Sequence, residues 1–373
     1  MKCFLSLLQI RLRIGFQVGF IALLLSCSVA KAEDGAVQKV RVGVLKFGTV
    51  NWVLDVIKEH QLDKKHGVDL QVVPLGSKNA THVAIQGGAA DMIVSDWIWV
   101  TRQRAEKRDY TFVSYSNAVG ALMVSPKSGI QTLAGLEGKK IGVAGGAVDK
   151  TWLLLSAYIQ KKQGKRLADW VKPSFAAPPL LNQLALRGDL DGALNFWHYT
   201  ARLQAAGFKS LVSLPDILKE LGIERPIPVI GWVFSEKWAA DNTSVTQGFL
   251  KAVGDAQTLL AESDQVWQRI RPKMKAKDDV IFETLKTAFR KGIPPCFDED
   301  EKQAARSTFA ILAKLGGEKL VGKSTELDEG TFWKGYNSVA CDMAKNTKES
   351  LQEKSAHVEK ARVENTKEKE ATD

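Results

Sequence analysis

The chain has 373 residues, of which 45% are hydrophobic and 25% are charged, and its formal net charge at pH 7 is +10. This length is sufficient for two packed domains. Lysine and arginine are dispersed among aspartate and glutamate without a basic stripe, which argues against nucleic-acid binding.

Residues 1–32 have the pattern of a cleavable signal peptide. Basic residues precede an apolar run at 20–25, and Ala30-Lys31-Ala32 supplies the small residues of a cleavage site. Cleavage after Ala32 would remove four basic and no acidic residues and lower the net charge from +10 to +6. An uncleaved anchor stays open, although the run is short of the ~20 residues of a membrane span. A lipoprotein anchored at Cys27 also stays open, although Leu25 stands where a smaller residue is usual.

Residues 39–124 alternate between β-rich and helical patterns, which is typical of a largely parallel sheet. The expected strands are 40–45, 69–74, 92–94, 110–115 and 121–124, and the expected helices are 52–60 and 80–86. No apolar run after residue 32 is long enough to span a membrane, so we expect a soluble mature chain.

Two stretches repeat one pattern about a hundred residues apart. The spacing of Gly88, Asp91 and Trp97 recurs in Gly188, Asp191 and Trp197. A second repeated pattern lies upstream of each stretch, in Val42-Gly43-Val44 and Ile141-Gly142-Val143. The repeat predicts two similar α/β lobes with a ligand in the cleft between them.

The second copy predicts a second lobe over 125–229, inserted into a first lobe made of 39–124 plus 230–344. The expected strands of the second lobe are 140–143 and 193–195, and its expected helices are 148–163, 179–186 and 199–206. We expect residues 229–235 to form a strand that returns to the first lobe. Residues 245–315 have a helical pattern. Residues 345–373 are dense in lysine and glutamate, and we expect a disordered tail.

Four loops follow the expected strands and would meet a ligand, because parallel strands end at one edge of a sheet. Tryptophan can stack on a ligand or pack on its own sheet, and both readings stay open for Trp97 and Trp197. The Gly145-Gly146 turn could hold an anion at a helix start. The candidate ligand-binding residues are Thr49, Asn51, Trp52, Ser95, Asp96, Trp97, Gly146, Ala147, Asn195, Trp197 and His198.

The sequence carries no pattern typical of an enzyme. The five histidines have no HExxH spacing, no cysteine pair has a zinc pattern, and no nucleotide-binding glycine fingerprint occurs. We therefore predict no catalytic residue, no metal and no cofactor. Cys296 and Cys341 remain after leader cleavage, and we favour one disulfide over two buried thiols.

Four segments resemble the periplasmic substrate-binding proteins of ABC importers of the nitrate/sulfonate/taurine type, which include binders of thiamine precursors. These segments are His66–Val73, Gly88–Trp97, Leu133–Val143 and Gly188–Trp197. The resemblance implies an α/β, two-lobed periplasmic-binding-protein fold of type II, or Venus-flytrap. It implies a periplasmic component that captures a small organic or inorganic anion, or a thiamine-precursor-like molecule. The ligand would pass to an ABC permease with its ATPase, and contact with the membrane would occur only through that permease.

Two departures from the family pattern leave the ligand open. The family motif commonly has Glu-Pro after the second tryptophan, whereas Trp197 is followed by His198-Tyr199, and the charged tail is not part of the pattern. Two other functions stay open. One is an enzyme on the same fold, similar to the thiamine-pyrimidine synthases, although their cysteine-rich motif is absent. The other is a periplasmic sensor without transport.

Overall fold

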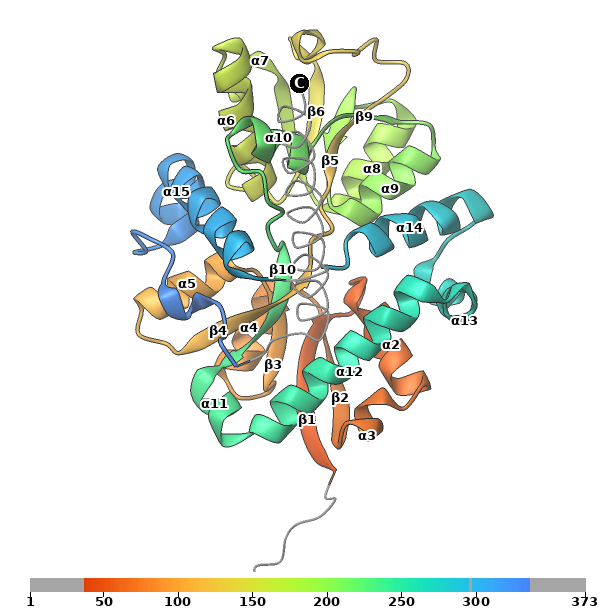
Figure 1. The fold of residues 1–373 in the computed structure, drawn as a ribbon. Coiled ribbons are helices and arrows are strands. Elements are labelled where there is room, and N and C mark those ends of the chain that lie inside the picture. Colours follow the sequence, from red (N-terminus) through yellow and green to blue (C-terminus); the bar gives the residue numbers. More distant parts are fainter. Residues whose placement is uncertain (1–36, 295–296, 336–373) are drawn as a thin grey trace, which may run out of the picture. The chain divides into compact units, whose positions relative to one another are not determined.

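The computed structural model describes residues 37–294 and 297–335, and within them ten strands form two five-stranded sheets (Figure 1). The first sheet has the order β2-β1-β3-β10-β4 and the second has the order β7-β6-β8-β5-β9. The strands of the first sheet are β1 (Gln38–Leu45), β2 (Val68–Leu75), β3 (Met92–Ser95), β4 (Tyr110–Ser116) and β10 (Ile230–Ser235). Those of the second are β5 (Ala121–Val124), β6 (Lys140–Ala144), β7 (Lys172–Ala176), β8 (Gly192–Leu194) and β9 (Lys209–Ser213).

The two sheets are equivalent strand for strand. β1 runs parallel to β2 and β3, and β6 runs parallel to β7 and β8. The fourth strand of each sheet, β10 or β5, is antiparallel to both of its neighbours. This matches the α/β, two-lobed fold that the internal repeat predicts.

The repeated aspartates hold equivalent structural positions at the start of β3 and β8. The Arg41 backbone N–H donates to Asp91 Oδ2 at 2.8 Å, and the Lys140 backbone N–H donates to Asp191 Oδ2 at 2.8 Å. Each carboxylate therefore fixes the first strand of its sheet to the strand beside it.

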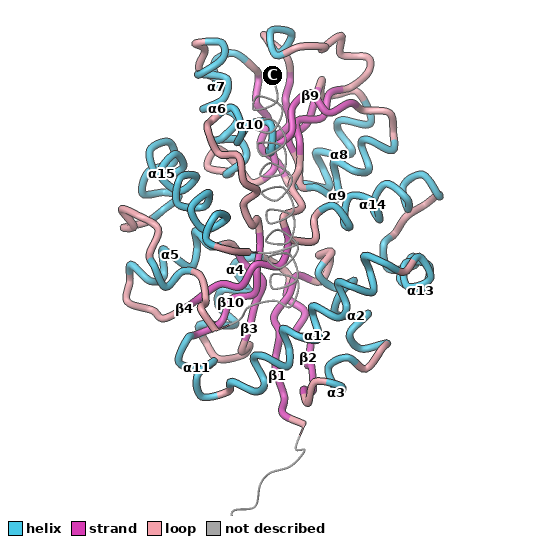
Figure 2. Tube along the Cα trace, in the orientation of Figure 1, coloured by secondary structure: helices cyan, strands magenta, loops and turns pink. Residues whose placement is uncertain are grey.

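Helices cover both faces of each sheet, as Figure 2 shows in cyan around the magenta strands. Contacts place α2, α3 and α12 on one face of the first sheet and α4 and α5 on the other. The longer helices are α2 (Val50–Glu59), α4 (Lys78–Gln86), α5 (Trp97–Ala105), α6 (Lys150–Gln163), α8 (Pro178–Arg187), α9 (Trp197–Ala205), α12 (Thr243–Glu262), α13 (Asp264–Met274), α14 (Asp279–Lys291) and α15 (Glu299–Val321). The shorter ones are α3 (Leu62–Lys65), α7 (Leu167–Trp170), α10 (Leu214–Glu220), α11 (Glu236–Asp241), η1 (Leu133–Leu136) and η2 (Glu329–Thr331).

Valine side chains at every second position of β1 point to one face of the first sheet, and this face is buried. Val40, Val42 and Val44 are at most 1% exposed and belong to the same apolar core as α2 and α12. Each fully buried valine contributes roughly 1.5 kcal/mol or more to folding. Among the described helices, none is long and apolar enough to cross a membrane.

β5 corrects one predicted boundary. The sequence analysis placed residues 121–124 at the end of the first lobe, but β5 pairs with β8 and β9 in the second sheet. Because β5 belongs to the second sheet, the boundary between the two lobes lies before Ala121. The other lobe boundaries stay predictions.

The chain passes between the sheets at residues 117–120 under tight steric limits. A Cβ atom at Gly120 would lie 1.7 Å from the Asn195 carbonyl oxygen, so only glycine fits. Nearby, the Asn117 N–H donates to the Gly292 carbonyl at 2.9 Å. The crossing segment therefore packs directly against the loop that follows β8.

Helices from the C-terminal part of the chain contact both lobes. α15 packs on α5 and on α6, and α14 packs on α9. Figure 1 shows α14 beside α9 and α15 beside α6. Two of the contacts between the lobes are thus helix packing.

Candidate functional site

Asp96 lies at the carboxyl end of β3 and joins groups from both lobes. Its Oδ1 accepts the Trp99 backbone N–H at 3.0 Å and caps α5. Its Oδ2 lies 2.6 Å from Lys78 Nζ and 3.1 Å from Lys150 Nζ, and its side chain is 7% exposed. Burial alone would raise the pKa of Asp96, but Lys150, Lys78 and the Trp99 N–H outweigh it and hold the pKa well below its usual range. Asp96 is therefore a buried carboxylate.

Lys150 comes from the second lobe, where it is the first residue of α6. Burial would lower its pKa, but the charges of Asp96 and Asp149 outweigh burial and raise it. Asp149 caps α6 by accepting the Thr151 and Trp152 backbone N–H groups at 2.9 and 3.1 Å, and burial raises the pKa of its carboxyl group. An ammonium group is thus held where the second lobe meets the first.

Lys78 begins α4, directly after β2 and the capping residue Ser77. One turn further along α4, His82 Nε2 lies 2.9 Å from Ser95 Oγ, and the His82 ring stacks on Trp99 at 4.2 Å. Burial and then the charge of Lys78 lower the pKa of His82 to about 4, so the ring is neutral at pH 7. The charges next to Asp96 are therefore those of the two lysines.

The tryptophans at the strand ends lie in different environments. Trp197 from α9 contacts Trp52 from α2, with ring centroids 5.9 Å apart, and Phe289 from α14 at 6.1 Å. Trp97 is 2% exposed and donates its indole N–H to the Pro228 carbonyl at 2.8 Å. The structure therefore argues against Trp97 as a cleft-lining side chain, because core packing and this hydrogen bond account for it. Trp52, at 5% exposed, is also largely covered.

The polar candidates on the β1 and β8 loops are partly used by their own loops. Asn51 Nδ2 donates to the Leu45 and Gly48 carbonyls at 2.9 and 2.8 Å. Asn195, 4% exposed, donates to the Pro178 carbonyl and accepts the Phe196 N–H. Thr49 is half-buried and caps α2 without a side-chain hydrogen bond.

The remaining second-lobe candidates are accessible or lack a partner. Gly146 is half-buried with φ 88°, and Ala147 is exposed. His198 Nδ1 is buried without a hydrogen-bond partner. Burial, followed by the charge of Arg202, lowers the pKa of His198 to about 4. Arg202 donates to the Met274 carbonyl of α13 at 2.7 Å and thereby joins α9 to the first lobe.

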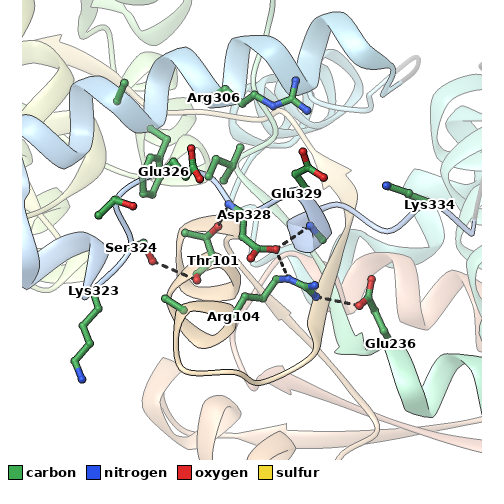
Figure 3. Close-up of a pocket in the computed structure, with 16 residues that line it drawn as sticks. Thr101, Arg104, Glu236, Arg306, Lys323, Ser324, Glu326, Asp328, Glu329 and Lys334 are labelled. Carbon is green, nitrogen blue, oxygen red and sulfur yellow. Dashed lines mark hydrogen bonds and ion pairs between the residues drawn. The ribbon is translucent and has the colours of Figure 1, made fainter.

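A separate hollow of about 950 Å³ lies between α5, α15 and the segment around Asp328, and none of the predicted ligand-binding residues lines it (Figure 3). Arg104 lies in it and pairs with Asp328 and with Glu236, the latter at 3.1 Å. Thr101 Oγ1 accepts the Asp328 N–H at 2.9 Å. Arg104 is thus neutralised by its own neighbours, and we assign no ligand to this hollow.

Some predictions concern residues that the structure does not describe. Cys296 and Cys341 lie outside the described residues, as do the leader 1–32 and the tail 345–373, so these stay predictions. Within the described ranges, no group of histidine, cysteine and acidic side chains could hold a metal ion.

A family model described as NMT1/THI5 like matches residues 63–263, more than half of the chain. The chain belongs to the NMT1/THI5-like family. This confirms the resemblance inferred from the four quoted segments. No curated protein matches the chain.

Solved structures share the fold of this NMT1/THI5-like protein. The aliphatic sulphonate-binding protein SsuA of Escherichia coli is 18% identical with a TM-score of 0.61, over 80% of this chain and 93% of that one. A sulfonate-binding SsuA from Methylobacillus flagellatus is 16% identical with a TM-score of 0.62, over 83% and 96%. The desulfurization enzyme DSZB is 15% identical with a TM-score of 0.54, over 80% and 97%. The fold is therefore that of two-lobed periplasmic binding proteins, and at least one enzyme shares it.

Sequence reasoning found Asp96 in this NMT1/THI5-like chain but missed its two partners. Lys78 follows Gly76-Ser77 at the end of β2, and Lys150 follows the Gly145-Gly146 turn and the capping Asp149. Both lysines directly follow a helix-capping residue at the end of a parallel strand. That position could have marked them as site residues.

Proposed function

We propose that this protein is the periplasmic solute-binding component of an ABC importer. It captures a small organic or inorganic anion, or a thiamine-precursor-like molecule, between its two lobes and delivers it to a membrane permease with its ATPase. The observation that carries the proposal is the meeting of Lys78 and Lys150 at Asp96, because the residues come from strand ends of both lobes. Family membership and the sulfonate-binding proteins of the same fold support it.

We propose binding rather than catalysis. The fold alone does not separate the two, since a desulfurization enzyme shares it. Two of the titratable groups at this point are poorly matched to proton transfer at neutral pH, because Asp96 is held as a carboxylate and the pKa of His82 is lowered to about 4. A general base works best with a pKa near the working pH. This favours a site that holds a solute without converting it.

The location and the binding residues belong to the same proposal. Residues 1–32 would direct export and be removed, so the mature protein would act in the periplasm. The proposed ligand contacts are Thr49, Gly146, Ala147, Trp197 and His198, together with Lys78 and Lys150.

Native mass spectrometry of the mature chain, expressed from residue 33 and purified without denaturation, tests the function. The expected result is a one-to-one complex with a small solute, released unchanged on unfolding. Prolonged incubation with that solute should give no product. Conversion of the solute, or binding confined to one lobe expressed alone at full affinity, would contradict the proposal.

A further inference from the structure

Two ammonium groups from different lobes share one carboxylate oxygen. Lys78 Nζ and Lys150 Nζ lie 2.6 and 3.1 Å from Asp96 Oδ2. An ammonium group has three donors, and Asp96 is the partner found for each lysine among the described residues. The pair therefore has donors to spare for a second oxygen.

Asp96 can release the lysines without losing its structural role. The helix cap uses Oδ1, which accepts the Trp99 N–H, whereas the lysines contact Oδ2. α5 would keep its cap if another oxygen replaced Oδ2 between the two ammonium groups. The second lobe has no equivalent carboxylate, because the repeat places Phe196 at this position.

The neighbouring groups favour an oxyanion at this point. His82 is neutral at pH 7 and adds no positive or negative charge. The Asp149 carboxylate is directed to the N–H groups of its own helix. The Lys78 side chain is 54% exposed and the Lys150 side chain is 30% exposed, so part of each side chain is accessible to solvent.

Exposed phenylalanines supply a second, independent observation. In the described part of the chain, Phe47, Phe175 and Phe196 are 79%, 44% and 47% exposed. Each lies within two residues of the carboxyl end of β1, β7 or β8, and these strands run parallel within their sheets. Because ligands of such sheets lie beyond those strand ends, the exposed rings favour an apolar body on the ligand.

We propose that Lys78 and Lys150 bind the carboxylate or sulfonate group of an anion with an apolar body, and that Asp96 occupies this subsite when no solute is bound. The inference rests on the proposed function and names the class of solute. Binding turns one donor of each lysine from Asp96 Oδ2 to an oxygen of the solute, while both ammonium groups stay beside Asp96 and compensate its buried charge.

Calorimetric titration of the mature protein with matched probes tests this. Benzenesulfonate and benzoate carry the two oxyanion groups, benzenesulfonamide is a neutral analogue, methanesulfonate lacks the ring, and benzylammonium is a cation. We expect one of the two aromatic anions to bind, with the sulfonamide and methanesulfonate at least tenfold weaker.

Variants separate the roles of the three residues. Lys78→Gln and Lys150→Gln should each weaken anion binding at least tenfold, whereas Lys150→Arg should retain it. Asp96→Asn should strengthen it at least threefold, because asparagine caps a helix as well as aspartate but does not compete for the lysines. Lys162→Gln, which removes an exposed pair with Glu220, is the control and should change nothing.

Unchanged affinity in both lysine-to-glutamine variants would overturn the inference. The inference would also be overturned if benzylammonium bound the wild-type protein but not Asp96→Asn, because Asp96 would then be the residue that binds a cation. If no anion binds even Asp96→Asn, the inference also fails. The proposed function survives that outcome if native mass spectrometry finds a neutral or cationic solute held between the lobes.

Discussion

Lys150 Nζ lies 3.1 Å from Asp96 Oδ2. Lys150 begins α6, which follows β6 of the second sheet, and Asp96 caps α5, which follows β3 of the first sheet. The contact joins the lobes at the edge where their parallel strands end. A second junction lies where Trp197 meets Trp52, and a third where Arg202 caps α13. The lobes are therefore connected by an ion pair, an aromatic contact and a helix cap at once.

The Asp96–Lys150 pair should contribute measurably to folding without any ligand. In a double-mutant cycle of Asp96→Asn and Lys150→Gln, we expect a coupling of about 1–3 kcal/mol in urea unfolding, because Asp96 is almost fully buried. The Arg166–Asp169 pair, whose side chains are 79% and 59% exposed, is the control and should couple by less than about 0.5 kcal/mol. Equal coupling in the two cycles would contradict a special role for the pair between the lobes.

Trp197→Ala should destabilise the protein by about 2–4 kcal/mol, because the ring packs between Trp52 and Phe289. The neighbouring Phe196→Ala removes a ring that is 47% exposed and should cost less than about 1 kcal/mol. Urea unfolding followed by circular dichroism measures both. A loss as large in Phe196→Ala as in Trp197→Ala would show that the packing is not specific to Trp197.

The sequence predicted most of the fold because its signals are local. The strands that correspond to β1–β6, β8 and β10 all have β-rich runs bounded by turns. β7 and β9 were missed. Both are edge strands, and β7 contains Pro173, which removes a backbone donor and is tolerated only at an edge. α5 was missed as well, because the Trp97–Ala105 stretch has buried residues around most of its surface.

The site was harder to predict because it depends on tertiary contacts. Trp97 and Trp197 share a motif, yet only Trp97 meets the Pro228 carbonyl, 131 residues away in the sequence. The convergence of Lys78 and Lys150 on Asp96 likewise depends on how the two lobes approach each other. A sequence motif identifies where a strand ends, but it does not identify which side chains from the two lobes contact each other there.

Gly120→Ala should severely destabilise the protein. The new Cβ atom would lie 1.7 Å from the Asn195 carbonyl oxygen, so the crossing segment or the β8 loop must move. We expect a loss of roughly 3 kcal/mol or more, measured by urea unfolding. Gly76→Ala is the control, since a Cβ there meets nothing within 4 Å, and it should change stability by less than about 1 kcal/mol. Comparable stability of the two variants would show that the crossing is not closely packed.

Stability should fall as the pH falls from about 6.5 to about 4. Burial lowers the pKa of His198 to about 4, so between these values the folded protein binds fewer protons than the unfolded chain. The stabilisation from a neutral His198 is thus complete above the unfolded pKa and lost as pH falls towards the folded one. His82 acts in the same direction, since its pKa is also about 4. Asp96 loses its contribution only at lower pH, because its pKa is held well below the usual value.

Urea unfolding at pH 7 and pH 4.5 checks this pH dependence. His198→Gln removes one titrating group and should shrink the difference in unfolding free energy between the two pH values by about 1–2 kcal/mol. His82→Gln should shrink it as well, because the pKa of His82 is also lowered to about 4. An unaltered difference in both variants would mean that neither histidine is responsible.

Solute binding should hold the two lobes closer together. Hinges need few residues, and the chain crosses between the sheets at residues 117–120 and again before β10. Because the proposed contacts come from both lobes, a bound solute stabilises the closed form by its added contacts. Small-angle scattering should show a smaller radius of gyration with solute, and tryptophan fluorescence should change as the contact between Trp52 and Trp197 becomes permanent. Trp197→Phe should abolish most of the fluorescence change while keeping the scattering change. Tight binding that leaves both readouts of the wild-type protein unaltered would instead indicate a rigid pocket within one lobe.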